Sequence, residues 1–163
     1  MLAKILTLAT TVTAAIIPRD NAETLSADYI WDILKWQAGE SHGAPTAPIT
    51  GWYDFNVSAP EYGDGPTRVP AFFAHCAGSA AGNPLSSEYS DCDLETGDEA
   101  AGAAVSARVL PVPGYAQAHI AVSYLFDGES ESRTKRNFTV VIVEDWARER
   151  PPHNFSAGPT EAA

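Results

Sequence analysis

The spacing of apolar and polar residues along the chain predicts strands. In the segment Ile49–Ser58, the residues Tyr53, Phe55 and Val57 fall on one face and polar side chains fall on the other. A period of two is typical of a strand with one buried face. Seven segments are predicted to be strands for this reason: Asp28–Trp36, Ile49–Ser58, Val69–Cys76, Glu88–Cys92, Val105–Leu110, Gln117–Phe126 and Arg136–Asp145.

Turn-forming segments separate these strands. Gly78–Pro84 is expected to turn the chain, Asp93–Gly102 to form an acidic loop, and Asp127–Lys135 to close a hairpin that begins with the turn dipeptide Asp-Gly. No segment has a helical period. The prediction is an all-β fold, a compact antiparallel β-barrel or sandwich of about seven strands. A single domain is expected over residues 28–147, followed by a disordered tail over 148–163.

The first strand carries two of the four tryptophans. Trp31 shares a face with Tyr29 and Ile33, and this face is expected to belong to the core. Uninterrupted alternation places Trp36 on the opposite face. The sequence therefore predicts that Trp31 and Trp36 point in opposite directions.

The N-terminal residues 1–15 are typical of an export signal. Lys4 supplies a positive start, Ile5–Val12 is mostly apolar, and Thr13-Ala14-Ala15 offers small residues for cleavage. The apolar run is about half as long as a membrane-spanning helix, and no second run approaches that length. Residues 16–27 are expected to be a flexible segment. We therefore expect a secreted, extracellular protein without a membrane anchor.

The formal charge of −11 at pH 7 bears on the choice of partner. Long-range repulsion opposes the encounter of an acidic protein with nucleic acid or with anionic lipid. Nucleic acid and membrane surfaces are accordingly not expected among the partners.

Cys76 and Cys92 are the two cysteines of the chain. In an oxidising compartment, two cysteines this close in sequence are most simply explained by one disulfide. Closing a loop of this length stabilises the fold by about 3 kcal/mol in the chain-entropy model. The alternatives are a reactive thiol and a metal-binding pair, but neither has a supporting spacing.

Three sequons follow the Asn-x-Ser/Thr rule, at Asn56, Asn137 and Asn154. Each triplet alone is a weak signal. Three of them behind an export signal favour at least one N-linked glycan.

The sequence does not predict catalysis. The four histidines are scattered, and no nucleophile elbow, zinc-protease motif or phosphate-binding loop occurs. The carboxylates between Glu88 and Glu99 do not have the spacing of a calcium loop, and a solvated loop is the preferred interpretation. We therefore expect a protein that is not an enzyme and has no metal site and no cofactor.

Trp52 is the candidate binding residue. It falls on the polar face of its predicted strand, together with Asp54 and Asn56. An exposed tryptophan beside polar groups is a common anchor for a sugar or a protein partner. We therefore predict a binding surface that includes Trp52 and Asp54.

Several short motifs resemble a known family. They are Asp28-Tyr29-Ile30-Trp31-Asp32-Ile33, then Phe55-Asn56-Val57, then Cys76, and finally Tyr89-Ser90-Asp91-Cys92. Their order is similar to that in the fungal secreted proteins related to the major Alternaria allergen. The resemblance implies a compact β-barrel, secretion by a filamentous fungus, and a role as an allergen, an elicitor of plant defence or a virulence effector. It also implies binding of a host defence protein or a small hydrophobic ligand.

The chain departs from this family in its cysteines. It lacks the additional N-terminal cysteine of the allergen's covalent dimer and a second cysteine pair near the C-terminus. A monomer or a non-covalent dimer is therefore expected. Two alternatives stay open, a secreted hydrolase or nuclease with an unrecognised site and a cell-wall-associated structural protein. The dibasic pair Lys135-Arg136 is either a processing site or, preferably, ordinary hairpin charge.

Overall fold

The computed structural model describes residues 28–97, 100–112, 116–129, 134–146 and 151–162, and in them the chain forms strands and no α-helix. The predicted signal (1–15) and flexible segment (16–27) lie outside the described residues. The strands are β1 (Trp31–Ser41), β2 (Ile49–Ala59), β3 (Phe72–Gly82), β4 (Ser90–Asp91), β5 (Asp93–Thr96), β6 (Ala104–Val109), β7 (Gln117–Asp127), β8 (Lys135–Asp145), β9 (His153–Ala157) and β10 (Thr160–Glu161), with one 3-10 turn, η1 (Gly65–Thr67).

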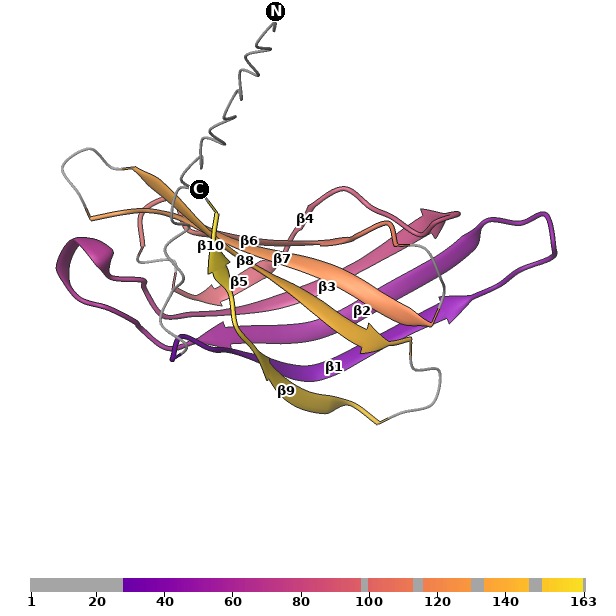
Figure 1. The fold of residues 1–163 in the computed structure, drawn as a ribbon, viewed down its shortest axis with the longest axis horizontal. Coiled ribbons are helices and arrows are strands. Elements are labelled where there is room, and N and C mark those ends of the chain that lie inside the picture. The colour runs from indigo at the N-terminus through magenta and orange to yellow at the C-terminus, as the bar shows by residue number, and fades with distance from the viewer. Residues whose placement is uncertain (1–27, 98–99, 113–115, 130–133, 147–150, 163) are drawn as a thin grey trace, which may run out of the picture.

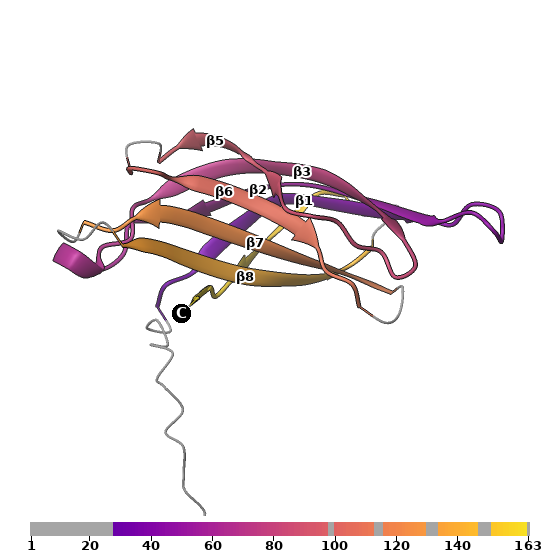
Figure 2. The same cartoon turned by 90° about the horizontal axis from the view of Figure 1, so that it is seen from above.

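The strands form two five-stranded antiparallel sheets, which pack as the two layers of a sandwich (Figures 1 and 2). Sheet one has the order β5-β3-β2-β1-β9, and sheet two has the order β10-β8-β7-β6-β4. The all-β prediction is confirmed, and of its two forms the sandwich is correct, because the sheets do not close into a barrel.

Segments of one and two residues pass from one sheet to the other at the edges of the sandwich. Cys92 connects β4 of sheet two with β5 of sheet one, and Gly158-Pro159 connects β9 of sheet one with β10 of sheet two. Strands that switch sheets at a bend form the corners of a β-sandwich. Each edge of the molecule is therefore bordered by a short continuous piece of chain.

The core lies between the sheets and is rich in aromatic rings. Phe72 of β3 contacts Trp31 of β1 edge to face, with ring centroids 5.2 Å apart, and contacts Tyr124 of β7 at 4.2 Å. All three side chains are buried. Burial of each large apolar side chain contributes on the order of 2 kcal/mol, so these contacts hold the two layers together. The prediction that Trp31 belongs to the core is confirmed.

The prediction that Trp36 lies on the opposite face is wrong, because a β-bulge interrupts the alternation of β1. The register shifts between Leu34 and Gln37, and Lys35 adopts a positive φ of 54°. The extra residue turns Trp36 inward, where it is 1% exposed and its ring lies 5.2 Å from that of Phe55.

The predicted disordered tail over 148–163 needs correction, because residues 153–157 and 160–161 are strands. In β9, Phe155 pairs with Ile33 of β1, and its ring lies 5.9 Å from that of Trp36. In β10, Glu161 pairs with Phe138 of β8. These residues are polar and proline-rich in sequence, but they pair with β1 and β8 at one edge of each sheet. The β domain predicted for 28–147 therefore includes residues 151–162.

Two further predictions about loops are wrong. β3 continues through Gly78 to Gly82, and β5 occupies residues 93–96 of the predicted acidic loop. A Cβ at position 78 would lie 2.4 Å from the Tyr53 hydroxyl oxygen, so Gly78 leaves room for that ring within a regular strand. β5, β9 and β10 are the strands that the count of seven omits.

Candidate functional site

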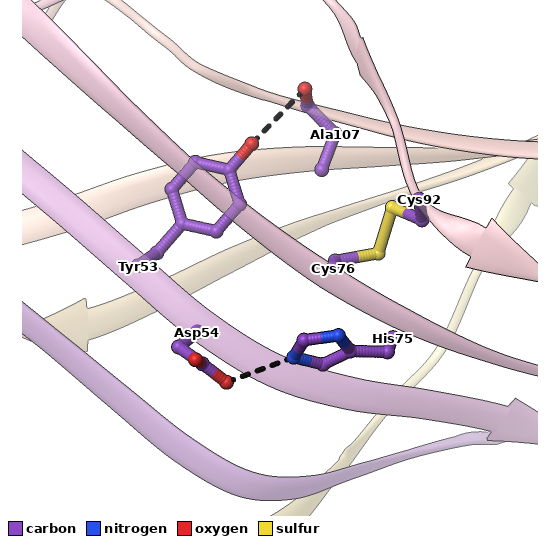
Figure 3. Close-up of a disulfide and its surroundings, with 6 residues drawn as sticks. All are labelled: Tyr53, Asp54, His75, Cys76, Cys92 and Ala107. Carbon is purple, nitrogen blue, oxygen red and sulfur yellow. Dashed lines mark hydrogen bonds and ion pairs between the residues drawn. A yellow bond between two sulfur atoms is a disulfide. The ribbon is translucent and has the colours of Figure 1, made fainter.

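The predicted disulfide is confirmed. Cys76, fully buried in β3, is bonded to Cys92, and the two Cα atoms are 4.5 Å apart (Figure 3). The backbone N–H of Cys92 also donates to the carbonyl of Val105 in β6. The bond therefore fixes the place where the chain passes from sheet two to sheet one. A buried sulfur in a disulfide is not a nucleophile, which argues for a structural role.

A second polar contact joins the sheets close to the disulfide. The hydroxyl of Tyr53 on β2 donates to the carbonyl oxygen of Ala107 on β6, at 3.2 Å (Figure 3). Burial raises the pKa of Tyr53, so the phenol stays protonated and able to donate.

Trp52 lies on the outer face of sheet one, as its alternation with Tyr53 predicts. Its side chain is 48% exposed, although it stands on β2, the middle strand of the sheet. A Cβ at Gly39 of β1 would lie 2.6 Å from the indole Nε1. The ring therefore leans over Gly39, which is buried beneath it. On the other side Trp52 pairs with Ser79 of β3, a small exposed residue.

Asp54 and His75 form a side-chain hydrogen bond next to this tryptophan. Asp54 follows Trp52 by two residues on the same face, and its Oδ1 lies 3.1 Å from Nε2 of His75 on β3 (Figure 3). The side chains are 50% and 36% exposed. Gln37, exposed on β1, pairs with Asp54 from the other side. We call Trp52, Gly39, Ser79, Asp54, His75 and Gln37 the Trp52 surface.

The structure thus brings the two predicted binding residues together and adds partners that the sequence does not indicate. His75 stands 21 positions from Asp54, and only the pairing of β2 with β3 makes them neighbours. Its strict alternation with the buried Ala74 and Cys76 was the one signal that its side chain faces outward.

Two other histidines are also paired with carboxylates. His42 contacts Glu40, and Nε2 of His153 lies 3.5 Å from Glu144. The segments of His42 and His153 are rich in proline, but these contacts give both rings a fixed partner. Each of the three histidines contacts a different carboxylate, so no shared histidine site emerges from these pairs.

The three sequon asparagines lie on three different strands. Asn56 is half-buried on the outer face of sheet one, and Asn137 of β8 accepts a hydrogen bond from Ser123. Asn154 of β9 is exposed, and its Oδ1 accepts the backbone N–H of Lys35 at 2.8 Å. Asn154 therefore supports the bulge that turns Trp36 into the core.

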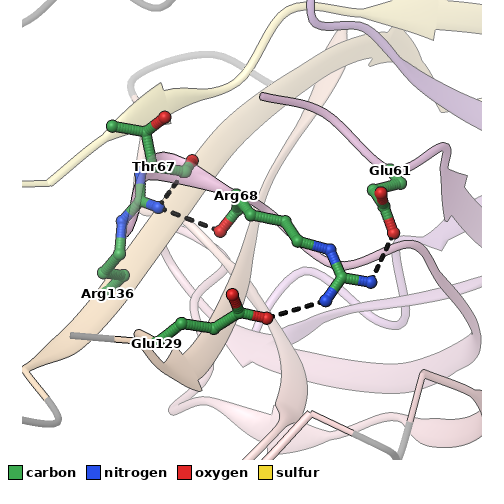
Figure 4. Close-up of polar contacts among 5 residues, drawn as sticks. All are labelled: Glu61, Thr67, Arg68, Glu129 and Arg136. Carbon is green, nitrogen blue, oxygen red and sulfur yellow. Dashed lines mark hydrogen bonds and ion pairs between the residues drawn. The ribbon is translucent and has the colours of Figure 1, made fainter. Parts of the chain in front are cut away.

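A pocket of about 570 Å³ lies at the end of the sandwich where the turn η1 meets the β7–β8 hairpin. Arg68 lines this pocket and contacts two carboxylates (Figure 4). Its Nη2 lies 2.6 Å from an oxygen of Glu61, and its Nη1 lies 2.7 Å from an oxygen of Glu129. Asp127 adds a third carboxylate to the lining. The Arg68 guanidinium holds the pKa of Glu61 below its usual range, and the two carboxylates raise the pKa of Arg68.

Arg136 links the same region to the C-terminal strand. Its Nη1 donates to the backbone carbonyls of Thr67 and Arg68 (Figure 4). Its Nε lies 2.7 Å from an oxygen of Glu161 of β10. The dibasic pair Lys135-Arg136 therefore begins a strand and is engaged in ion pairs, since Lys135 contacts Asp127 at 3.2 Å.

Within the described ranges, no three histidine, cysteine or acidic side chains are grouped as a metal site would require. In the same part of the chain, no helix has the length and apolar character needed to cross a membrane.

The chain matches no protein-family model, no curated protein and no solved structure. The resemblance to the Alternaria allergen family therefore stays a prediction.

Proposed function

We propose that this is a secreted, non-enzymatic binding protein of the fungal allergen and effector kind. It acts by contact with a host protein or a small ligand and thereby modulates or triggers host defence. The Trp52 surface is the place of contact. The observation that carries this proposal is the 48% exposure of Trp52 on the middle strand of a sheet. Tryptophan is one of the residue types enriched among the energetically dominant residues of binding surfaces.

The rest of the molecule supports a recognition role for this face. The core, the disulfide and the inter-sheet contact of Tyr53 supply a rigid frame, and a rigid frame reduces the entropy that binding costs. The pocket beside Arg68 has three carboxylates in its lining, which suits a polar ligand better than a hydrophobic one. A surface contact is therefore favoured over enclosure of a hydrophobic molecule.

The His75–Asp54 pair is the one observation in favour of the second candidate, a secreted hydrolase. A carboxylate that orients an imidazole is part of many catalytic sites. Incubating the protein with polymeric host substrates and measuring the released products separates the two candidates. A binding protein releases no product, whereas a hydrolase that uses His75 releases product, and His75→Gln abolishes that release.

The proposed function is tested by infiltrating purified protein into host tissue and measuring the defence response. Trp52→Ala is compared with Val141→Ala, which removes an equally exposed apolar side chain from sheet two. The proposal expects a large loss of response for Trp52→Ala and none for Val141→Ala. An unchanged response for Trp52→Ala, with the variant folded, would refute the assignment of this surface.

A further inference from the structure

We infer that the ligand of the Trp52 surface is a neutral polysaccharide chain, stacked by one of its pyranose rings on the indole. This inference rests on the proposed function and specifies its ligand. It follows from the composition of the surface, from the small residues around Trp52 and from the charge of the chain.

The composition of the Trp52 surface matches the two kinds of group on a sugar. A pyranose ring has an apolar face of C–H groups and a rim of hydroxyls. The exposed indole offers an apolar plane, and Asp54, His75 and Gln37 offer hydrogen-bonding groups beside it. Trp52 and Asp54 are two residues apart on one strand, so their Cα atoms are about 7 Å apart. A ring stacked on Trp52 thus has its rim within reach of Asp54.

The neighbours of Trp52 on β1 and β3 include several small side chains that offer little apolar area. Gly39 lies beneath the ring, and Ala77, Ser79 and Ala81 are the exposed outer residues of β3 beside it. A dominant tryptophan in a protein–protein interface is usually ringed by contacts that exclude water around it. These small side chains offer little for such a ring, but they leave room for a chain of sugars to cross the strands.

The hydrogen bond with His75 orients Asp54 towards hydroxyl groups of a ligand. The imidazole holds Oδ1 at 3.1 Å, so the carboxylate keeps a defined orientation on the sheet. Its second oxygen takes no part in that contact and can accept a hydrogen bond from a hydroxyl group. Hydrogen bonds to carboxylate acceptors are among the stronger ones.

Charge decides between neutral and acidic polysaccharides. The chain carries a formal charge of −11, and Asp54 itself stands beside the indole. A polyuronate would meet repulsion both at long range and at the site. The ligand is therefore a glycan without carboxylates or sulfates.

The test uses purified full-length secreted protein and four defined probes: laminarihexaose, cellohexaose, chitohexaose and, as the acidic comparison, oligogalacturonate. Calorimetry measures association, and protection of tryptophan fluorescence from acrylamide reports whether the indole is covered. We expect binding of at least one neutral probe with protection of Trp52, and no binding of oligogalacturonate. Binding of oligogalacturonate alone, or of no neutral probe, overturns the inference.

Variants show whether this surface is responsible. Trp52→Ala is expected to weaken binding by about tenfold or more, Asp54→Asn by less, and Val141→Ala not at all. Trp52→Phe retains a smaller ring and should fall between wild type and Trp52→Ala, which keeps the test valid if the alanine variant unfolds. If wild type, Trp52→Phe and Trp52→Ala all bind the glycan with the same affinity, the stacking contact is contradicted.

The outcome also separates this inference from the proposed function. If no glycan binds but the host response still depends on Trp52, the surface binds a different partner, and only the inference of a polysaccharide fails. If neither glycan binding nor the host response depends on Trp52, both fail.

Discussion

The indole of Trp52 leans over Gly39 so closely that a Cβ at position 39 would lie 2.6 Å from the ring nitrogen. The glycine and the tryptophan come from neighbouring strands and pair directly across them. The position of the exposed ring is therefore set by the absence of a side chain on β1.

Gly39→Ala is expected to displace the indole while leaving Trp52 itself intact. Because the added methyl group meets the ring, the side chain must rotate away from β1, and ligand binding should fall by about tenfold, as in Trp52→Ala. Acrylamide quenching of tryptophan fluorescence measures the change in exposure. The matched variant Gly65→Ala has open space around its Cβ, although its positive φ of 53° costs stability, and it should leave the quenching unchanged. Identical quenching in Gly39→Ala and wild type would contradict this account.

The disulfide between Cys76 and Cys92 should contribute substantially to the stability of the fold. Replacing Cys76 and Cys92 by alanine is expected to lower the free energy of unfolding by about 3 kcal/mol, because the unfolded chain regains the entropy of an open loop. Urea denaturation with and without a reducing agent measures the effect. The reductant should destabilise the wild type and leave the double variant unaffected. A loss below about 1 kcal/mol would show that packing alone fixes the corner between β4 and β5.

Lys35→Gly should make the protein more stable than Lys35→Ala. Both changes remove the lysine side chain, but only glycine adopts a φ of 54° without steric cost. The expected difference in unfolding free energy is about 1 kcal/mol in favour of glycine, measured by urea denaturation. Equal stabilities would mean that the bulge is not formed in solution.

The C-terminal strands should stabilise the sandwich. Phe155→Ala is expected to lower the free energy of unfolding by about 2 kcal/mol, because the ring is partly buried against Trp36. Thr160→Ala, at an exposed side chain of the adjoining strand, should change it by less than about 0.5 kcal/mol. Thermal denaturation compares the two variants. No effect of Phe155→Ala would restore the interpretation of residues 151–162 as a disordered tail.

Stability should decline at alkaline pH as buried tyrosines are forced to ionise. Burial raises the pKa of Tyr29 from its ordinary value of 10.0 to about 12, and it raises the pKa of Tyr124 as well. The folded state therefore holds the phenol proton more tightly than the unfolded chain does. The stabilisation is complete below pH 10 and is lost as pH rises towards 12.

Denaturation at a series of alkaline pH values, with tyrosinate absorbance as a second readout, measures this dependence. Tyr29→Phe should reduce the slope of stability against pH, because it removes one of the titrating groups. An unchanged slope in that variant would show that Tyr29 ionises normally in the folded protein.

Much of the fold could be predicted because alternation survives wherever a strand is regular. The inward positions of β2 and β7, the disulfide and the outward position of Trp52 all follow from sequence. Alternation failed at Lys35, where one extra residue reverses which side chains of β1 point inward. The sequence gives no indication of the positive φ at this lysine. It also failed for β9 and β10, because their pairing depends on edges of β1 and β8 that sequence does not reveal.

The Trp52 surface was predictable only in part, for a related reason. The faces of Trp52 and Asp54 depend on one strand, and local periodicity determines them. The places of His75, Gln37 and Gly39 depend on register between strands, which is a long-range property.

The amino-acid sequence by itself determined the all-β class, the disulfide and the outward position of Trp52. Each of these depends on local spacing or on residue type. The tertiary structure decided that the fold is an open sandwich, that the C-terminal residues complete its edges, and that an imidazole stands beside Asp54. These features require segments up to 124 positions apart, such as Asp32 and Ser156, to meet in space. Only the packing of the whole chain selects such pairs, because each segment alone could join several edges equally well.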